Sequence, residues 1–185
     1  MLIHHKGTNS IETVRLLLRR FRLEDAEDMF YNWAGDPEVC KFLMWGPHKN
    51  VEASQRRIMN WVNQYEWKRS YAWAIELKSM GMVIGSISME ISNDSGLYCE
   101  VGYCLGKAFW NRGIMTEALR AVMHYLFYEV GYQRIYAKFD VLNKASGRVM
   151  EKAGMHFFKN EYRVGVRRDG SYYDCAVYEK NIMDV

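Results

Sequence analysis

The stretch Glu100–Thr116 (EVGYCLGKAFWNRGIMT) joins a predicted strand to a predicted helix through a loop that contains Arg112 and Gly113. The first N–H groups of a helix are unpaired and the helix dipole is positive there, so such a start binds anions when glycine allows close approach. Neither G-x-x-x-x-G-K-[ST] nor G-x-G-x-x-G occurs in the chain, which excludes the two common nucleotide-binding loops. From these residues alone an ordinary strand–helix turn is the favoured interpretation, with an anion site as the alternative.

Four segments of the chain match, in order, the motifs of one protein family. They are EVGY at 100–103, WNRGIMTEA at 110–118, NKAS at 143–146 with VMEKAG at 149–154, and DGSYYD at 169–174. RLLLRR at 15–20 and DPEV at 36–39 also fit. With these motifs the chain resembles the GNAT N-acetyltransferases, in the subgroup typified by the ribosomal-protein acetyltransferases of the RimJ/RimL type. The resemblance covers essentially the whole chain.

The resemblance implies that acetyl-CoA binds in a cleft between the strand at Tyr103 and the strand at 134–140. The pyrophosphate would accept hydrogen bonds from the loop and helix start, and the pantetheine amides would pair with an open strand edge. A backbone N–H of the same strand would donate to the thioester oxygen. The donor-binding residues implied are Tyr103, Cys104, Leu105, Asn111, Arg112, Gly113, Ile114, Met115, Thr116, Asn143 and Ser146. Met115 departs from the family, which usually has glycine or alanine there, so the loop must accommodate a larger side chain.

Acetyl transfer to nitrogen requires a neutral amine, so the pKa of the amine decides how strong a base the enzyme needs. At pH 7, deprotonating a lysine amine of pKa near 10.4 costs roughly 4–5 kcal/mol, whereas an α-amine of pKa near 7.8 costs about 1 kcal/mol. An N-terminal acceptor therefore needs only a weak base, and Glu100 is the candidate, acting directly or through a water. The alternatives for Glu100 are a solvated position on its strand or an ion pair with a basic neighbour.

Ser146 and Asn143 belong to the N-x-x-S motif that follows the strand at 134–140. The resemblance implies that Ser146 either donates a hydrogen bond to the leaving sulfur or relays a proton to it. A serine hydroxyl is a poor acid, which favours the hydrogen bond. Asn143 would bond the pantetheine. Each residue has a structural alternative as the cap of the following helix.

The last motif places Tyr172 and Asp174 near the end of the chain. The resemblance implies that they line the acceptor pocket or brace the sheet, and we favour bracing. The acidic run between Glu24 and Asp28 also has two interpretations, attraction of a cationic substrate or a solvated helix face. We favour the solvated face.

Hydrophobic periodicity predicts the elements that hold these residues. Strands are predicted at 14–21, 71–77, 82–91, 97–105, 134–140, 155–164 and 172–179, and helices at 23–33, 52–67, 114–130 and 144–153. The segment Arg168-Asp169-Gly170 is a hairpin-turn signal between the last two strands. The order β-α-α-β-β-β-α-β-α-β-β predicts a mixed α/β fold of the α+β type, with about seven strands and about four helices. It equals the GNAT order.

Length and composition limit the remaining classes. The chain has 185 residues, a net charge of +3 and 49% apolar residues, which predicts a single ordered domain over 1–185. Its pI near 8.6, without clustered Lys and Arg, argues against nucleic acid as the primary partner. No apolar run is long enough to span a membrane and no secretory signal is visible, so we expect a cytoplasmic protein. The four cysteines and five histidines lack metal-ligand spacing, and we expect reduced thiols and no metal.

These observations predict an acetyl-CoA-dependent N-acetyltransferase that acts by direct attack in a ternary complex, since the sequence contains no recognisable Cys–His pair. We expect the acceptor to be a protein N-terminus, such as that of a ribosomal protein. The alternatives are a small amine (an aminoglycoside, a polyamine or an amino acid) and a non-catalytic acyl-CoA-binding module. An edge strand in the final pair would support a homodimer.

Overall fold

The structure, a computed structural model, describes residues 3–167 and 170–184 of the chain. Its helices and strands are β1 (Ile11–Glu12), β2 (Leu16–Arg19), α1 (Ala26–Met29), α2 (Val51–Gln64), β3 (Ala72–Leu77), β4 (Met82–Asn93), β5 (Tyr98–Leu105), α3 (Ile114–His124), β6 (Arg134–Asp140), α4 (Lys144–Lys152), β7 (His156–Val166) and β8 (Tyr172–Asn181). The predicted turn residues Arg168 and Asp169 lie outside the described residues.

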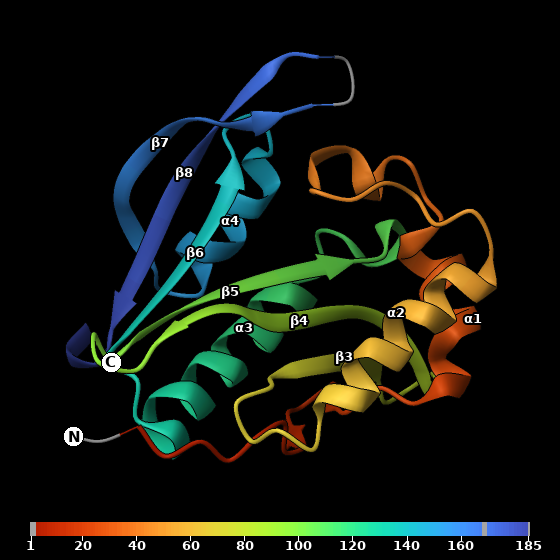
Figure 1. Ribbon diagram of the computed structural model, residues 1–185, viewed down its shortest axis with the longest axis horizontal. Coiled ribbons are helices and arrows are strands. Elements are labelled where there is room, and N and C mark those ends of the chain that lie inside the picture. Colours follow the sequence, from red (N-terminus) through yellow and green to blue (C-terminus); the bar gives the residue numbers. More distant parts are fainter. Residues whose placement is uncertain (1–2, 168–169, 185) are drawn as a thin grey trace.

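The strands form one mixed sheet in the order β1-β2-β3-β4-β5-β6-β8-β7 (Figure 1). Every neighbouring pair is antiparallel except β5 and β6, which are parallel because α3 connects them as a crossover. The predicted fold class is confirmed. The sheet has eight strands, whereas about seven were predicted. The additional strand is the two-residue β1, which pairs with β2 and is too short to show a periodic pattern in the sequence.

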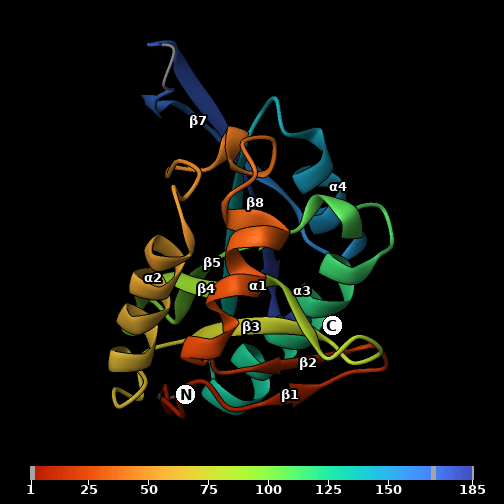
Figure 2. The ribbon, with the colours of Figure 1, turned by 90° about the vertical axis from the view of Figure 1, so that its right-hand side faces the viewer.

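Side chains alternate along the strands and so enter two separate cores, one on each face of the sheet. On β3, Trp73 and Ile75 pack in the core beneath α3, whereas Ala72 and Ala74 pack in the core beneath α1 and α2. Figure 2 shows the corresponding arrangement, with α2 on one side of the sheet and α3 and α4 on the other. This alternation decides which face of the sheet each site residue occupies.

The helices begin where the sequence predicts, but two of them change geometry at their ends. The predicted helix at 114–130 consists of α3 followed by a π-helical turn at Tyr125–Val130, and Gly131 ends it at φ 101°. The predicted helix at 23–33 consists of a 3₁₀ turn at Leu23–Asp25, α1 and a π-helical turn at Phe30–Ala34. Spacings of three and four residues fit all three helix types over one turn, so periodicity does not distinguish them.

The solvated face favoured for the acidic run is wrong for two of its residues. Asp25 is buried, and both of its carboxylate oxygens accept hydrogen bonds from the Arg19 guanidinium at 2.8 Å. Asp28 accepts a hydrogen bond from the backbone N–H of Val83 at 2.8 Å, and burial raises its pKa. These carboxylates fix the first helical segment to the sheet, so they are structural.

Candidate active site

The parallel strands β5 and β6 separate halfway along their length. Their pairing begins at Tyr98 and ends at Glu100, which lies opposite Tyr136. Beyond that point β6 continues against β8 as far as Asp140, while β5 stays with β4 (Figure 1). Among the described residues, the edge of β5 that faced β6 therefore has no strand partner over residues 101–105. Such an open edge pairs with any extended chain that carries amides.

A cavity of about 570 Å³ lies at this opening. Strand β5, the start of α3 and the start of α4 line it, together with the turn at Val39–Phe42. The structure brings together here all but one of the predicted donor-site residues: Tyr103, Cys104, Leu105, Asn111, Gly113, Ile114, Met115, Thr116, Asn143 and Ser146. Arg112 is absent from the lining, and its guanidinium lies 5.9 Å from the ring centre of Phe109.

The loop before α3 has the conformation of an anion site. Asn111 and Gly113 both adopt left-handed backbone angles, with φ of 59° and 72°, on either side of Arg112. No side chain from the described residues caps α3, and its first backbone bond runs from the Glu117 N–H to Gly113. The N–H groups before Glu117 are therefore available to an anion. A backbone that alternates between left-handed and right-handed conformations, as this loop does, forms a concavity that binds anions.

Two residues that the sequence analysis did not single out hold this loop in place. The Glu117 carboxylate accepts hydrogen bonds from Thr13 Oγ1 at 2.6 Å and from Arg15 Nε at 2.7 Å, while Arg15 Nη1 donates to the Arg112 carbonyl at 2.8 Å. Burial alone would raise the pKa of Glu117, but these hydrogen bonds outweigh it and lower the pKa below its usual value. Arg15 and Glu117 were both within quoted motifs, yet only the fold brings them into contact.

Met115 does not obstruct the loop. Its side chain is buried and belongs to the core beneath α3. The departure from the family pattern therefore adds volume to the core and leaves the backbone of the loop accessible.

Tyr103 and Ser146 contact each other across the cavity. The Tyr103 hydroxyl lies 2.9 Å from Ser146 Oγ and donates to the Ser146 carbonyl at 3.0 Å. Burial raises the pKa of Tyr103 well above its usual value, against the smaller lowering from Ser146, so the phenol stays protonated. The Asn143 side chain caps α4 by accepting from the Ser146 N–H, which confirms the structural alternative for Asn143 and removes the capping alternative for Ser146.

Glu100 lies where the two strands begin to separate, on the face of the sheet that carries α1 and α2. Its neighbours Cys99 and Val101 pack beneath α3, so the Glu100 side chain points to the opposite face. There its carboxylate forms an ion pair with Lys138 on β6, at 3.2 Å. Burial alone would lower the pKa of Lys138, but the charge and hydrogen bond of Glu100 outweigh it and raise the pKa. The ion-pair alternative for Glu100 is therefore present in the structure.

Comparison with known proteins identifies the family. Residues 15–156 match the acetyltransferase (GNAT) domain. The chain is 29% identical to the N-acetyltransferase YoaA of Bacillus subtilis, over 95% of either chain. The chain belongs to the GNAT acetyltransferase family.

Solved structures share its fold. The microcin C7 self-immunity acetyltransferase MccE, in complex with acetyl-CoA and AMP, superposes with a TM-score of 0.82 over 92% of this chain and 94% of MccE, at 21% identity. The ribosomal-protein-S5-alanine acetyltransferase of Vibrio fischeri superposes with a TM-score of 0.80 over 94% of this chain and 96% of that protein, at 19% identity.

GNAT acetyltransferases take their acetyl group from acetyl-CoA, and the residues at the opening fit this donor. The open edge of β5 presents backbone amides to an extended molecule that itself carries amides. The uncapped start of α3 presents N–H groups to an anion. This chain is therefore an N-acetyltransferase with acetyl-CoA as its acetyl donor.

The last predicted pair, Tyr172 and Asp174, lies outside the cavity. Tyr172 is exposed, with the Arg163 guanidinium 4.0 Å from its ring centre. Asp174 accepts a hydrogen bond from the Arg163 backbone N–H at 2.8 Å, where β7 has a left-handed residue at φ 50°. This hydrogen bond links β7 to β8 and agrees with a bracing role for Asp174, while the acceptor-pocket alternative stays a prediction. The first residue of this motif, Asp169, lies outside the described residues.

The remaining polar groups of this GNAT domain add no metal site over residues 3–167 and 170–184, where no three His, Cys, Asp or Glu side chains gather as they would around an ion. All four cysteines are buried thiols, and burial raises the pKa of Cys99, Cys104 and Cys175, the last to about 11. Within the same described part of the chain, no helix combines the length and the hydropathy that crossing a membrane requires.

Proposed function

We propose that this enzyme acetylates the N-terminal amine of a protein, such as a ribosomal protein. The observation that carries the proposal is the separation of β5 and β6, which gives the donor an open strand edge and exposes Glu100 on the α1/α2 face beside it. A carboxylate is a strong enough base for an α-amine, whereas deprotonating a lysine amine at pH 7 costs several kcal/mol more and needs a stronger base. The likeness to a ribosomal-protein-S5-alanine acetyltransferase agrees with this acceptor.

In this proposal the donor is held mainly by backbone groups. The N–H groups of the loop and of the α3 start, Arg112 to Thr116, donate to the pyrophosphate. The backbone of Tyr103, Cys104 and Leu105 pairs with the pantetheine amides, and a backbone N–H of β5 donates to the thioester oxygen. Asn143, besides capping α4, contacts the pantetheine from the cavity wall.

The transfer itself forms a C–N bond between the amine and the thioester carbon and breaks the C–S bond. Glu100 takes the amine proton, directly or through a water, so the acceptor amine must compete with Lys138 for this carboxylate. Ser146 donates a hydrogen bond to the departing sulfur, while its bond to Tyr103 fixes the position of its hydroxyl. The thiolate then gains the proton that the amine lost, so the products are an amide and CoA.

Direct attack fits the state of the cysteines. A ping-pong route would need a thiolate nucleophile activated by a base, whereas burial raises the pKa of Cys99, Cys104 and Cys175. The buried thiols also fit a reducing compartment such as the cytoplasm, where we propose that the enzyme works.

The acceptor is tested by incubating the protein with isotope-labelled acetyl-CoA and a ribosome-containing cell extract. The labelled products are separated by mass and the modified peptides are sequenced. Label on the N-terminus of one protein would support the proposal and name the acceptor. Label confined to small molecules would overturn it in favour of a metabolite or drug acetyltransferase.

The base is tested with Glu100→Gln, which keeps the size of the side chain and removes its charge. We expect kcat to fall by about 10²-fold or more while the Kd for acetyl-CoA stays unchanged. Glu129→Gln is the control, because Glu129 is an exposed carboxylate paired with Lys6 at 2.7 Å and does not line the cavity. Turnover that survives in Glu100→Gln would remove Glu100 from the mechanism.

We also propose that two copies pair through β7, which lies at the edge of the sheet. Phe157, Phe158 and Tyr162 are exposed along it, and an apolar edge strand pairs readily with another chain. Light scattering on a size-exclusion column would give twice the 21.9 kDa chain mass, and Phe158→Lys would return it to the monomer.

A further inference from the structure

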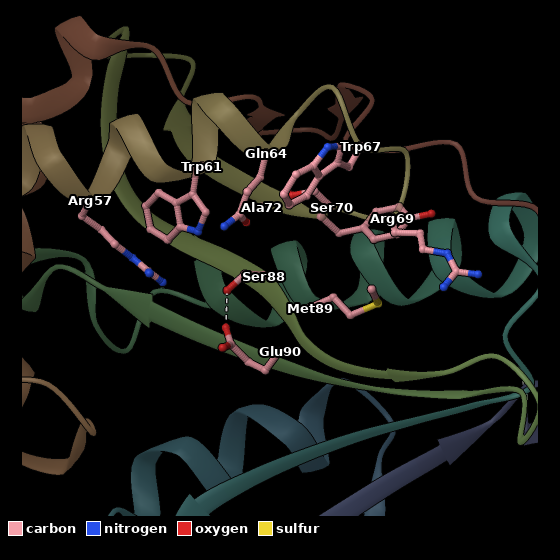
Figure 3. Close-up of a pocket in the computed structure, with 11 residues that line it drawn as sticks. Arg57, Trp61, Gln64, Trp67, Arg69, Ser70, Ala72, Ser88, Met89 and Glu90 are labelled. Carbon is pink, nitrogen blue, oxygen red and sulfur yellow. Dashed lines mark hydrogen bonds between the residues drawn. The ribbon is translucent and has the colours of Figure 1, made fainter.

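A groove separate from the donor cavity lies between α2 and the outer part of β4. Its volume is about 330 Å³. Figure 3 shows Arg57, Trp61 and Gln64 along α2 and Trp67 and Arg69 beyond the end of that helix, with Ser88, Met89 and Glu90 across from them on β4. Aromatic rings and two arginines therefore form one wall, and the sheet forms the floor.

The floor of the groove adjoins the strand where the separation begins. Ser88 lies opposite Gly102 of β5 in the sheet register, and Ala72 of β3 lies opposite Ser88. Glu90, which accepts a hydrogen bond from Ser88 at 2.5 Å, lies over Gly102, where a Cβ would come within 3.1 Å of the Glu90 side chain. Because strands lie about 4.8 Å apart, the groove extends roughly 5 to 10 Å from β5 on the face that carries Glu100.

Arg57 and Glu90 both line this groove, but they do not form an ion pair, and the Glu90 carboxylate is bonded to Ser88 instead. The Arg57 guanidinium lies 4.3 Å from the ring centre of Trp61, which itself stacks on buried Phe21 with ring centres 4.6 Å apart. Over residues 3–167 and 170–184, no carboxylate forms an ion pair with Arg57, whereas Arg69 is paired with Asp94 at 2.9 Å. A guanidinium that packs against an aromatic ring can still form two parallel bonds to a carboxylate through its N–H groups.

The surroundings of Arg57 add positive charge. Arg56 precedes it on α2, and the pKa of nearby His48 is lowered, first by burial and then by the charges of Arg57 and Arg56. The charges of Arg57 and Arg56 therefore favour an anion over a second cation beside α2, whereas the Glu90 carboxylate on the floor of the groove acts in the opposite direction.

We infer that this groove binds the part of the acceptor next to its amine and that Arg57 selects an acceptor with an anionic group there. An extended peptide advances about 3.3 Å per residue, so with its amine beside Glu100 it places its second or third side chain in the groove. The inference rests on the proposed function and narrows it to N-termini with an acidic residue at one of these positions. It argues against polyamines and aminoglycosides, which would place positive charge at Arg57.

The test measures kcat/KM for matched N-terminal peptides with Glu or Gln at positions two and three, with phosphoserine there, and for spermidine. We expect the wild type to prefer the Glu peptide to the Gln peptide by about tenfold, which corresponds to about 1.4 kcal/mol. Arg57→Gln should reduce this ratio to near one. Arg56→Gln makes the same charge change on the same helix but outside the groove, so it should lower the ratio much less than Arg57→Gln does. A phosphoserine peptide that exceeds the Glu peptide would identify phosphate as the anion that Arg57 binds.

Failure of the groove and failure of the proposed function give different results. Equal rates for the Glu and Gln peptides, a ratio unchanged in Arg57→Gln, or a preference for spermidine would overturn the groove assignment while acetyl transfer remains. Absence of transfer to every amine would overturn the proposed function and with it the acceptor class. Tryptophan fluorescence gives a readout independent of turnover, because Trp61 and Trp67 line the groove, and the Glu peptide should quench it at lower concentration than the Gln peptide.

Discussion

A pair of substitutions at Gly113 tests the donor loop, because the two differ by one charge and little else. Gly113 has φ 72°, and a Cβ built on it would meet only the Arg15 guanidinium, at 3.6 Å. A larger side chain therefore finds space, and the left-handed backbone costs a residue other than glycine roughly 1–2 kcal/mol. Asn and Asp tolerate this conformation best and have the same shape, so Gly113→Asn and Gly113→Asp carry nearly the same folding penalty.

The ratio of the Kd values of the two variants for acetyl-CoA measures the repulsion between the introduced carboxylate and the pyrophosphate. Two unit charges about 6 Å apart interact by about 3 kcal/mol at an effective dielectric constant of 20. Solvent at the loop and the neighbouring Arg15 reduce this to about 1.4–2.5 kcal/mol, so we expect Gly113→Asp to bind acetyl-CoA about 10- to 60-fold more weakly than Gly113→Asn.

The assay is isothermal titration calorimetry with acetyl-CoA at two salt concentrations, accompanied by melting temperatures for both variants. The gap between Asp and Asn should narrow as salt rises, because salt screens an exposed charge. S-acetylpantetheine, which has no pyrophosphate, should serve both variants equally as donor in the transfer assay. Equal affinities of the two variants for acetyl-CoA, or an equal loss with S-acetylpantetheine, would refute the placement of the pyrophosphate at this loop.

Three further substitutions test the contacts around the site. Hydrogen bonds lower the pKa of Glu117 against the effect of burial, so its charge stabilises the fold fully above pH 4.5 and progressively less as the pH falls below that value. Glu117→Gln should therefore melt a few degrees lower than wild type at pH 7, and the gap should shrink as the pH is lowered below 4.5; a gap independent of pH would contradict this. Arg167→Met removes the hydrogen bond that the buried Asp140 carboxylate accepts at 2.6 Å, so the free energy of unfolding in urea should fall by about 3 kcal/mol. A fall of less than about 1 kcal/mol would exclude this pair as an anchor of the β7–β8 hairpin. Tyr103→Phe removes the hydroxyl that holds Ser146 Oγ in place, so kcat should fall. The Kd for acetyl-CoA should stay within about threefold, because Tyr103 is proposed to contact the donor through its backbone. A large change in Kd alone would show that the Tyr103 hydroxyl binds the donor.

The sequence predicted the central elements closely because their patterns are long and regular. Strand β5 was predicted at 97–105 and observed at Tyr98–Leu105, and the helix that follows begins at Ile114 as predicted. It did not reveal the buried pair of Arg19 with Asp25 or that of Arg167 with Asp140. Arginine and aspartate are usually exposed to solvent, so neither partner alone indicates burial. Only the folded sheet brings the two charges together away from water.

The shape of the proposed donor site could be predicted from the sequence for a reason that does not extend to the acceptor side. A pyrophosphate held by N–H groups and a pantetheine paired with a strand edge require backbone shape, and Gly113 and the strand–loop–helix order are visible in a single sequence. The exception on this side is Arg15, which precedes β2 and whose side chain braces the loop from a position far away in the sequence.

The acceptor side depends instead on side chains that the fold brings together from separate elements. Arg57 becomes a candidate for recognition only when its partner, Trp61, and its distance from any carboxylate are known. Glu90 lies over Gly102 at a point where the register of β4 against β5 shifts between Met89 and Ile91, and no pattern in the sequence signals that irregularity. It follows that relatives which share this donor loop can differ in acceptor, and that exchanging the residues on the groove wall should change which amine is acetylated while acetyl-CoA binding stays the same.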